Sequence, residues 1–385
     1  MPQPTKSFFF SASLAALLAI CLAITGCGSS SSSTTHGCTG TCVPGAFLFV
    51  ATPAQVYGYA PLTAGPLTSP ISTSPSAASA PSIAVTPNSN FLFEPDLIFH
   101  SVLAFSIDNS TGALTLLATH PLGPSSQGGV GSAITPTGSA LYVSDMNGDV
   151  LGFRIASGGA LTGLTGSLLP SSQRPHLLAI DPAGKYLYAN DPNDQVLVYA
   201  IQADGSLVPV PGSPFKVATG SDPQSLAVDS SGKFLYVTLA KAGKVAGFAI
   251  NANTGALTPV PSSPFPAGRQ PAALGITPNH FLYVINGLDN SISAYQINSM
   301  SGQLTEATGS PFPAGTPINS ELVVPFPGSV ASDHTGLRLW IAAPWSTSVA
   351  SFSINGTTGA LSPLGIANLP ANTPPGYLNL AFYNP

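Results

Sequence analysis

The sequence predicts an all-β protein, a seven-bladed β-propeller in which each blade has four strands. Two observations carry this prediction. The pattern Gly-x-Leu recurs seven times at intervals of 46 to 57 residues, and short apolar segments separated by turn residues fill each interval. Repeats of roughly 40–50 residues with frequent turn signals are typical of propeller blades, and helical spacing of apolar residues is absent. The seven glycines of the pattern are Gly65, Gly112, Gly159, Gly205, Gly255, Gly302 and Gly359.

Two further markers lie between successive copies of Gly-x-Leu. Leu-Tyr followed by Val or Ala occurs four times, and Ser-Pro-Phe occurs three times. Their recurrence indicates that each repeat is a copy of one structural unit. The first marker lies at 141–143, 187–189, 235–237 and 282–284, and the second lies at 213–215, 263–265 and 310–312.

The elements of one unit can be predicted in order from residues 224–271. Apolar or alternating segments predict three strands, and clusters of Asp, Asn, Ser and Gly between them predict tight turns. A weak fourth strand is expected before the next unit begins. The three strands are expected at 224–228, 234–238 and 245–250, and the turns at 229–233 and 251–255.

The two ends of the repeat region predict how the ring closes. Residues 46–50 match the second strand of a unit and have no first strand before them. Residues 377–382 match a first strand and have no second strand after them. We therefore expect residues 378–383 to pair with residues 46–51 in one blade, which leaves no open edge between the first and last blades.

An export signal precedes the repeats. Lys6 supplies a positive charge, and residues 8–24 are apolar apart from small polar residues. The following Ile-Thr-Gly-Cys at 24–27 resembles the lipobox of bacterial lipoproteins, which implies cleavage before Cys27 and a lipid on its sulfur. An ordinary signal peptide is the alternative. We therefore divide the chain into a signal peptide at 1–26, a lipidated serine-rich tether at 27–44 and the propeller at 45–385.

The composition limits the classes of binding partner, and the cysteines predict a disulfide. Charged residues make up 6% of the chain and the net charge is −5, which argues against nucleic-acid binding because that needs a basic surface. Beyond the N-terminal segment, no apolar run is long enough to span a membrane as a helix. We expect a monomer attached to the outer membrane of the cell envelope by its lipid alone. Cys38 and Cys42 are expected to form a disulfide, since export preserves such bonds.

Blade four carries the clearest resemblance to a known family. Arg174-Pro175-His176 precedes its first strand, and Asp191-Pro192-Asn193-Asp194 follows its second strand. With the repeat pattern, these residues resemble the lactonase family of seven-bladed propellers, which includes 6-phosphogluconolactonases, and the repeats are similar to YVTN surface propellers. The resemblance implies lactone hydrolysis at this blade. Blade five departs from the family pattern, with Ser-Asp-Pro-Gln at 221–224 where Gly-Pro-Arg-His is expected.

Candidate site residues lie in loops at one end of the blades. His176 has a suitable pKa for a general base, with Asp191 or Asp194 as its orienting partner. Arg174 or Arg269 is a candidate oxyanion donor, within a basic sector that also includes Lys241 and Lys244.

A series of carboxylates follows the second strands of three consecutive blades, namely Asp96, Asp145 and Asp191. They would either bind a divalent cation or cap their own loops by hydrogen bonds to the backbone. No cofactor is required by these features, although a divalent cation is compatible with them.

Two functions follow from the sequence. The first is hydrolysis of a lactone, with a neutral or uronic lactone favoured because a phosphorylated sugar is an unusual substrate outside the cytoplasm. The second is a non-catalytic surface propeller that binds a carbohydrate or a cell-envelope protein, an interpretation that the departure in blade five favours.

Overall fold

The computed structural model describes residues 46–60, 67, 69–77, 79–164, 174–315, 329–342, 347–370 and 379–383. The predicted signal peptide and tether, with Cys27, Cys38 and Cys42, lie outside these residues. Every regular element that the structure describes is a β-strand. Within the same ranges, no helix long and apolar enough to cross a membrane is found.

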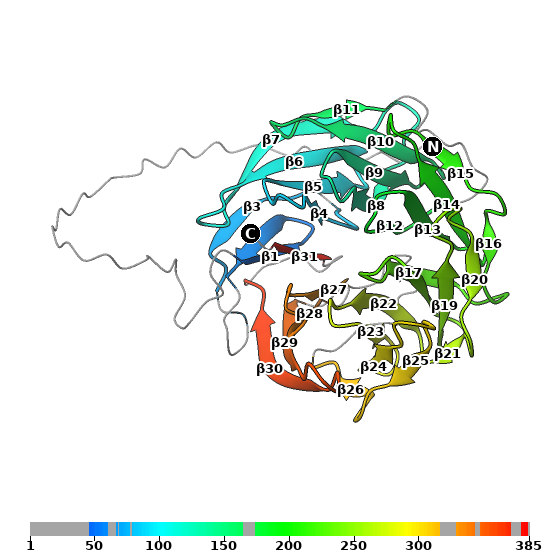
Figure 1. Ribbon diagram of the computed structural model, residues 1–385. Helices are drawn as coiled ribbons and strands as arrows, with labels where there is room; N and C mark the ends of the chain where they lie inside the picture. The colour runs from blue at the N-terminus through cyan, green and yellow to red at the C-terminus, as the bar shows by residue number, and fades with distance from the viewer. Residues whose placement is uncertain are drawn as a thin grey trace, which may run out of the picture. The chain divides into compact units, whose positions relative to one another are not determined.

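The strands form seven separate antiparallel sheets arranged as blades of a ring (Figure 1), which confirms the predicted seven-bladed propeller. From the axis outward, blade 1 is β31 (Asn379–Tyr383), β1 (Phe47–Ala51), β2 (Gln55–Tyr59) and β3 (Ser72–Pro75). Blade 2 is β4 (Ala84–Val85), β5 (Phe91–Asp96), β6 (Ser101–Ile107) and β7 (Leu114–Pro121). Blade 3 is β8 (Gly129–Ile134), β9 (Ala140–Asp145), β10 (Val150–Ile155) and β11 (Leu161–Gly163).

Blades 4 to 6 carry a fifth short strand. Blade 4 is β12 (Leu178–Ile180), β13 (Tyr186–Asp191), β14 (Gln195–Ile201), β15 (Leu207–Pro209) and β16 (Phe215–Lys216). Blade 5 is β17 (Pro223–Val228), β18 (Phe234–Leu239), β19 (Lys244–Ile250), β20 (Leu257–Pro259) and β21 (Phe265–Pro266). Blade 6 is β22 (Pro271–Ile276), β23 (Phe281–Asn286), β24 (Ser291–Ile297), β25 (Leu304–Glu306) and β26 (Phe312–Pro313). Blade 7 is β27 (Ser329–Ser332), β28 (Arg338–Ala342), β29 (Ser348–Ile354) and β30 (Leu361–Asn368).

Ring closure follows the prediction from the two ends of the repeat region. β31 pairs antiparallel with β1, from Phe47 opposite Tyr383 to Ala51 opposite Asn379. The last strand of the chain is therefore the innermost strand of the first blade. This pairing removes the edge that β1 would otherwise expose along the channel.

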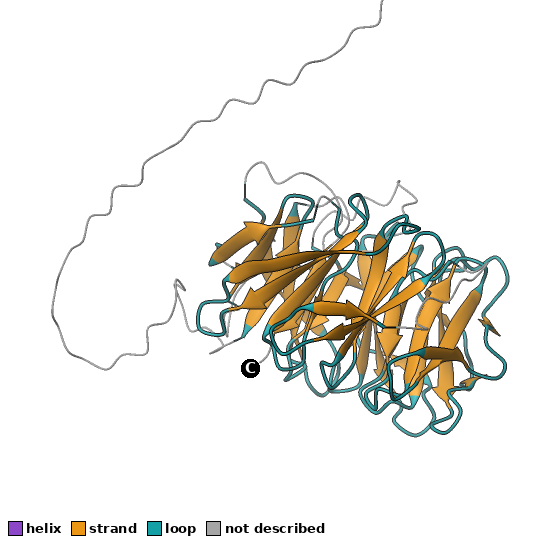
Figure 2. Cartoon of the chain, turned by 90° about the horizontal axis from the view of Figure 1, so that it is seen from above, coloured by secondary structure: helices purple, strands orange, loops and turns teal. Residues whose placement is uncertain are grey.

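The strands run between two opposite faces at which the loops gather (Figure 2). We call one the crossover face. It carries the segments that lead into each innermost strand and the loops between second and third strands, such as 192–194. The other is the turn face, which carries the tight turns between first and second and between third and fourth strands, such as 229–233 and 251–255.

The hydrophobic core lies between neighbouring blades. Side chains of a strand alternate between its two faces, so each second strand packs against both neighbours. In β18, Leu235 and Val237 pack with residues of blade 4, whereas Phe234 and Tyr236 pack with residues of blade 6. The second strands of blades 1 to 6 are wholly buried, and that of blade 7 is buried except at Arg338, so the blades pack together through these strands.

Two of the sequence markers are in contact across neighbouring blades. The tyrosine of Leu-Tyr-Val donates a hydrogen bond to the carbonyl of the Gly-x-Leu glycine in the next blade, as in Tyr236 to Gly302 at 2.7 Å and Tyr283 to Gly359 at 2.9 Å. Gly302 has a φ of 72°, and a Cβ there would lie 2.3 Å from the ring of Phe234. Glycine is therefore required both by the backbone conformation and by the close packing of the blades.

The Ser-Pro-Phe marker explains the fifth strand of blades 4 to 6. In each, the serine Oγ accepts a hydrogen bond from the backbone N–H of a third-strand residue, namely Val198, Gly247 or Ala294 at 2.9–3.0 Å. The expected fourth strand is thereby divided into two pieces that both pair with the third strand. The sequence pattern predicted one weak strand here. The division was not predicted because the serine side chain takes the place of a backbone acceptor, which leaves no mark on the spacing of apolar residues.

The tyrosine bond gives a matched test of blade-to-blade coupling. Tyr236→Phe is expected to lower the free energy of unfolding by about 1–2 kcal/mol, because it removes the buried hydrogen bond to Gly302. Tyr188→Phe in blade 4 is the control: its buried hydroxyl makes no hydrogen bond within the described residues. We expect that change to be neutral or stabilising. Equal destabilisation of the two variants in chemical denaturation would contradict a specific contribution from the bond.

Candidate functional site

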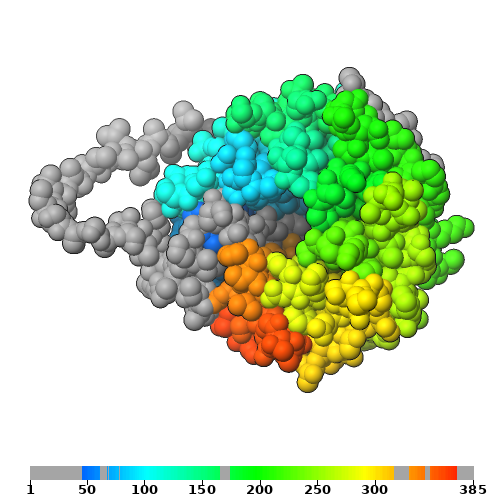
Figure 3. Space-filling model, in the orientation of Figure 1, coloured from blue at the N-terminus to red at the C-terminus, as the bar shows by residue number. Residues whose placement is uncertain are grey.

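The predicted residues of blade four lie at the crossover face. His176 lies two residues before β12, and Asp191 ends β13, the neighbouring strand of the same sheet. The backbone N–H of His176 donates to the carbonyl of Asn190 at 3.0 Å, which extends the pairing of these two strands to the edge of the face. The innermost strands surround a centre that is hollowed in the space-filling view (Figure 3).

Asn190 ties the innermost strands of blades 4 and 5 together. Its Oδ1 accepts a hydrogen bond from the Leu177 N–H, and its Nδ2 donates to the Pro223 carbonyl, both at 2.9 Å. Leu177 follows His176 and Pro223 follows Asp222 in the chain. The amide of Asn190 therefore brings the backbone at His176 close to the backbone at Asp222.

His176 is also held from the other side. Ser144 is the fifth residue of β9, as Asn190 is of β13, and its hydroxyl donates to the carbonyl of His176. The same Ser144 Oγ accepts from the Gly131 N–H at 2.8 Å. At this position, Ser144 thus connects the innermost segments of blades 3 and 4, as Asn190 connects those of blades 4 and 5. His176 is fixed by blade 3 through its C=O and by Asn190 through its N–H.

The surroundings of His176 favour a neutral imidazole. Its side chain is half-buried, and burial lowers the pKa of His176 below its ordinary value of 6.5. The carboxylates of Asp191 and Asp222 act to raise this pKa, and the guanidinium of Arg174 acts to lower it further. A neutral imidazole near pH 7, with carboxylates close enough to stabilise its protonated form, has the electrostatics of a general base.

Asp222 is the site residue that sequence reasoning missed. Its side chain is 18% exposed, its Oδ1 accepts from Gln224 Nε2 at 2.9 Å, and its Oδ2 lies 3.8 Å from Lys241 Nζ. Its φ of 57° is a left-handed conformation that Asp tolerates better than most residues. The available signal was positional: Asp222 precedes Pro223 in blade 5 as Arg174 precedes Pro175 in blade 4.

Asp194 serves the loop that carries Asp222. Its carboxylate accepts from the N–H groups of Gly220, Ser221 and Asp222 at 2.5–3.1 Å. Burial acts to raise its pKa, but these backbone donors outweigh burial and lower the pKa below its ordinary value. Of the two predicted partners of His176, Asp191 is the one whose charge acts on the imidazole, whereas Asp194 fixes the neighbouring segment.

The three carboxylates that follow successive second strands each shape a loop. Asp96 Oδ1 accepts from the Ile98 N–H at 2.8 Å. Asp145 Oδ1 accepts from Gln127 and Asn147, and Asp191 Oδ1 accepts from Asn193, at 2.8–3.0 Å. Among the described residues, no group of three or more His, Cys, Asp or Glu side chains is placed to hold a metal ion. The structure therefore brings no shared cation site together from Asp96, Asp145 and Asp191, because each serves its own blade.

Two cations of the predicted basic sector form ion pairs. Arg269 Nε lies 2.6 Å from Asp289 Oδ1, and its Nη2 donates to the Leu288 carbonyl at 3.3 Å. Lys241 faces Asp222. Arg174 is exposed and forms no ion pair with any described residue. Of the two predicted oxyanion donors, Arg174 is thus the one whose charge no described carboxylate neutralises.

Glu94 is a buried carboxyl group at a position that other blades keep apolar. It is the fourth residue of β5 and is 0% exposed. The Ser76 hydroxyl and the Ala77 N–H donate to its carboxylate. Burial raises the pKa of Glu94 to about 7 despite these donors. The equivalent residues of the other blades are Val50, Val143, Ala189, Val237, Val284 and Ile341.

Glu94 should make folding stability depend on pH. A carboxyl whose pKa rises from 4.5 to about 7 on folding keeps its proton longer in the folded chain than in the unfolded chain. Its contribution to stability is therefore lost as pH rises from about 4.5 to 7, by about 3 kcal/mol in total. Glu94→Gln is expected to remove this slope and to raise the melting temperature at pH 8 relative to wild type. Asp108→Asn, which changes an exposed carboxylate, is the control. A wild-type slope retained in Glu94→Gln would refute the assignment.

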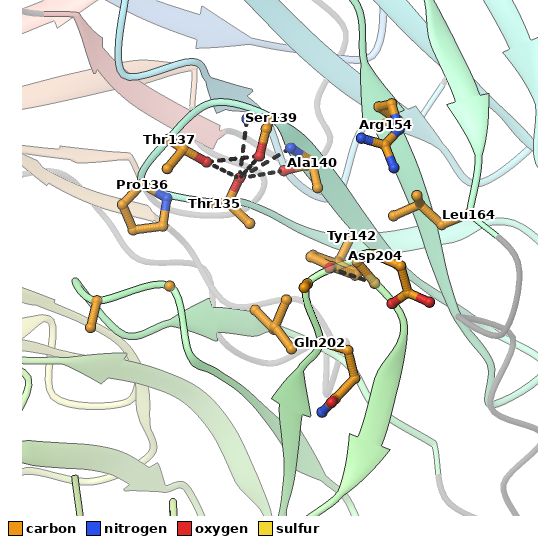
Figure 4. A pocket seen from close by; sticks show the side chains of 15 residues that line it. Thr135, Pro136, Thr137, Ser139, Ala140, Tyr142, Arg154, Leu164, Gln202 and Asp204 are labelled. Carbon is orange, nitrogen blue, oxygen red and sulfur yellow. Dashed lines mark hydrogen bonds between the residues drawn. The ribbon is translucent and has the colours of Figure 1, made fainter. Parts of the chain in front are cut away.

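A separate pocket lies on the turn face between blades 3 and 4 (Figure 4). Its cavity volume is about 180 Å³, and it opens to solvent. The Tyr142 hydroxyl donates to the Gly205 carbonyl at 2.7 Å at its base. Its polar lining comes from Thr135, Thr137, Ser139, Arg154, Gln202 and Asp204. The sequence placed all candidate site residues at the opposite end of the blades, so this concave polar surface was not predicted.

Comparison with known proteins places the chain in a class. The sequence pattern of the family described as "Lactonase, 7-bladed beta-propeller" matches residues 63–374, so the chain belongs to this family. Among proteins of curated function, none matches it.

Two solved structures illustrate the likeness. The periplasmic gluconolactonase of Pseudomonas aeruginosa superposes with a TM-score of 0.71 at 20% identity, over 87% of this chain and 98% of the other. A candidate 6-phosphogluconolactonase of Bacteroides uniformis gives a TM-score of 0.72 at 18% identity, over 87% and 99% of the two chains. At these identities, the likeness establishes a shared fold.

Proposed function

We propose that this protein hydrolyses a lactone at the crossover face of blades 4 and 5. The observation that carries the proposal is the position of His176: its backbone is fixed by Ser144 and Asn190, and its imidazole is kept neutral near Asp191 and Asp222. Membership of the lactonase family supports the reaction class.

The chemistry needs a base, a charge partner for the protonated base and an oxyanion donor. His176 takes a proton from water as the water oxygen attacks the lactone carbonyl carbon. Arg174 stabilises the negative charge that develops on the carbonyl oxygen, and Asp191 and Asp222 stabilise the imidazolium. The ring C–O bond then breaks, and the imidazolium returns its proton to the leaving oxygen, which yields a hydroxy acid.

A panel of lactones tests the proposal. Purified protein should accelerate ring opening of at least one sugar lactone above the spontaneous rate, and a chelator should leave that rate unchanged. Loss of activity with chelator would indicate that a divalent cation is needed. A complete absence of hydrolysis across the panel would contradict the enzymatic proposal.

Carbohydrate binding without catalysis is the second candidate. The turn-face pocket favours it, because hydroxyl groups, the Arg154 guanidinium and the Asp204 carboxylate are the types of group that bind sugar hydroxyls. Calorimetric titration with oligosaccharides would distinguish the two, since binding here should be weakened by Arg154→Ala and unaffected by changes at His176.

We also propose that the protein is exported and attached to the cell envelope through lipid on Cys27. The lipobox resemblance at residues 24–27 supports this, as does the periplasmic location of a structural neighbour. The intact mass of the mature protein tests it: an unmodified Cys27 would contradict the anchor.

A further inference from the structure

Resting on the proposed lactone hydrolysis, we propose that the site selects an uncharged lactone. Asp222, together with Asp191, would disfavour lactones that carry a phosphate or a carboxylate. Asp222 then acts as a specificity-determining residue, through its fixed negative charge beside the general base.

The geometry fixes that charge near the reacting groups. Asn190 bonds both Leu177 and Pro223, so His176 and Asp222 stand at the same end of two neighbouring innermost strands. Gln224 Nε2 donates to the Asp222 carboxylate, Lys241 Nζ lies 3.8 Å from it, and the N–H of Asp222 donates to Asp194. A carboxylate restrained in this way cannot turn aside to admit a second negative charge.

The charge balance around His176 leaves little positive charge to bind an anionic substrate. Asp191 and Asp222 both act electrostatically on the imidazole, and Lys241 is engaged by Asp222. Arg174 is the cation whose charge acts on the imidazole, and ring opening needs it for the oxyanion. Phosphate recognition ordinarily uses several cationic or N–H donors, frequently in bidentate geometry.

Backbone donors at the same place are already used. The N–H groups of Gly220, Ser221 and Asp222 point to Asp194, whose carboxylate occupies the position in which a loop of successive N–H groups could bind a phosphate. The protein thus fills this anion-binding loop with its own side chain. Both the side-chain charges and the backbone of the loop therefore oppose an anionic substrate.

Two substrates that differ by one phosphate group test the inference, namely glucono-1,5-lactone and its 6-phosphate. We expect wild-type kcat/KM to be at least about tenfold higher for the neutral lactone, which corresponds to about 1.4 kcal/mol of discrimination between the two substrates. The preference should weaken as salt is added, because mobile ions screen the repulsion. A purely steric preference would not respond to salt.

Asp222→Asn tests the residue, and Asp108→Asn is the matched control. Both remove one negative charge, but Asp108 is exposed in the turn between β6 and β7 of blade 2, on the turn face. We expect Asp222→Asn to raise the ratio of kcat/KM for the phosphorylated over the neutral lactone about tenfold, whatever it does to the absolute rates, and Asp108→Asn to leave the ratio unchanged.

The outcomes separate this inference from the proposed function. Faster or equal hydrolysis of the phosphorylated lactone by wild type would overturn the inference and leave lactone hydrolysis standing. An unchanged ratio in Asp222→Asn would overturn the role of Asp222. Hydrolysis of neither compound, nor of any lactone in the wider panel, would overturn the proposed function itself and the inference with it.

Discussion

Replacing His176 by alanine is expected to lower the rate of lactone hydrolysis by about 10²–10⁴-fold, the usual contribution of a general base. The backbone bonds of this residue to Ser144 and Asn190 do not depend on its side chain, so the melting temperature should stay close to that of wild type. Steady-state kinetics with the most reactive lactone of the panel, together with thermal unfolding, measures both effects.

His120→Ala is the matched control for that experiment. His120 lies on β7, the outer strand of blade 2, and is also partly buried, with a pKa lowered by burial. Its replacement should leave hydrolysis unchanged. Equal activity of His176→Ala and wild type would remove His176 from the mechanism, even if hydrolysis itself were established.

The pH profile provides an independent check on the same residue. A general base must be neutral, and burial lowers the pKa of His176, so the rate should fall only when the pH drops below the ordinary histidine value of 6.5. Asp191 and Asp222 act to raise that pKa. Asp191→Asn should therefore move the acidic limb of the profile to still lower pH.

Deleting residues 377–385 is expected to abolish cooperative folding or to lower stability by several kcal/mol. The deletion removes β31, whose five residues pair with every residue of β1, and β1 is wholly buried. At a net value of about 0.5–1.5 kcal/mol for each hydrogen bond, the loss would be a large part of the 5–15 kcal/mol that stabilises an ordinary domain. The opened channel edge should also promote association between chains.

Deleting residues 384–385 alone is the control, because β31 ends at Tyr383. This shorter deletion should unfold like the full chain in thermal and denaturant titrations. If the longer deletion also melted like the full chain and stayed monodisperse, the closing strand would contribute little, and the argument from the two chain ends would fail.

The blade pattern could be predicted from sequence because every repeat restates it. The strands expected at 234–238 and 245–250 correspond to Phe234–Leu239 and Lys244–Ile250 in the structure. Closure was predictable for the same reason. The repeat region begins with a second strand that lacks a first strand and ends with a first strand that lacks a second, so these two strands can pair in one blade. The hydrogen bond from Tyr236 to Gly302 was not foreseen, because the two markers lie in different blades.

The candidate site was predictable only in part. Arg174, His176 and Asp191 could be found by their family-like spacing, and the face on which they lie followed from the alternation of strands. Asp222 was missed because it belongs to the next blade, and its relation to His176 depends on the Asn190 amide that bonds Leu177 and Pro223. The partners of Arg269 and Asp194 likewise come from other loops, at Asp289 and at residues 220–222.

By itself the sequence determined the number of blades, the order of strands within each and the strand that closes the ring, because these depend on local periodicity repeated seven times. The tertiary structure alone decided which charges act together. Lys241 and Arg269 form ion pairs, and Asp96 and Asp145 accept hydrogen bonds from backbone N–H groups of nearby loops. Glu94 is buried at a strand position that is apolar in the other blades. The physical reason is that charge and hydrogen bonding act over a few ångströms between groups from different strands, loops or blades, and those distances arise only when the strands of each blade pair and the blades pack around the axis.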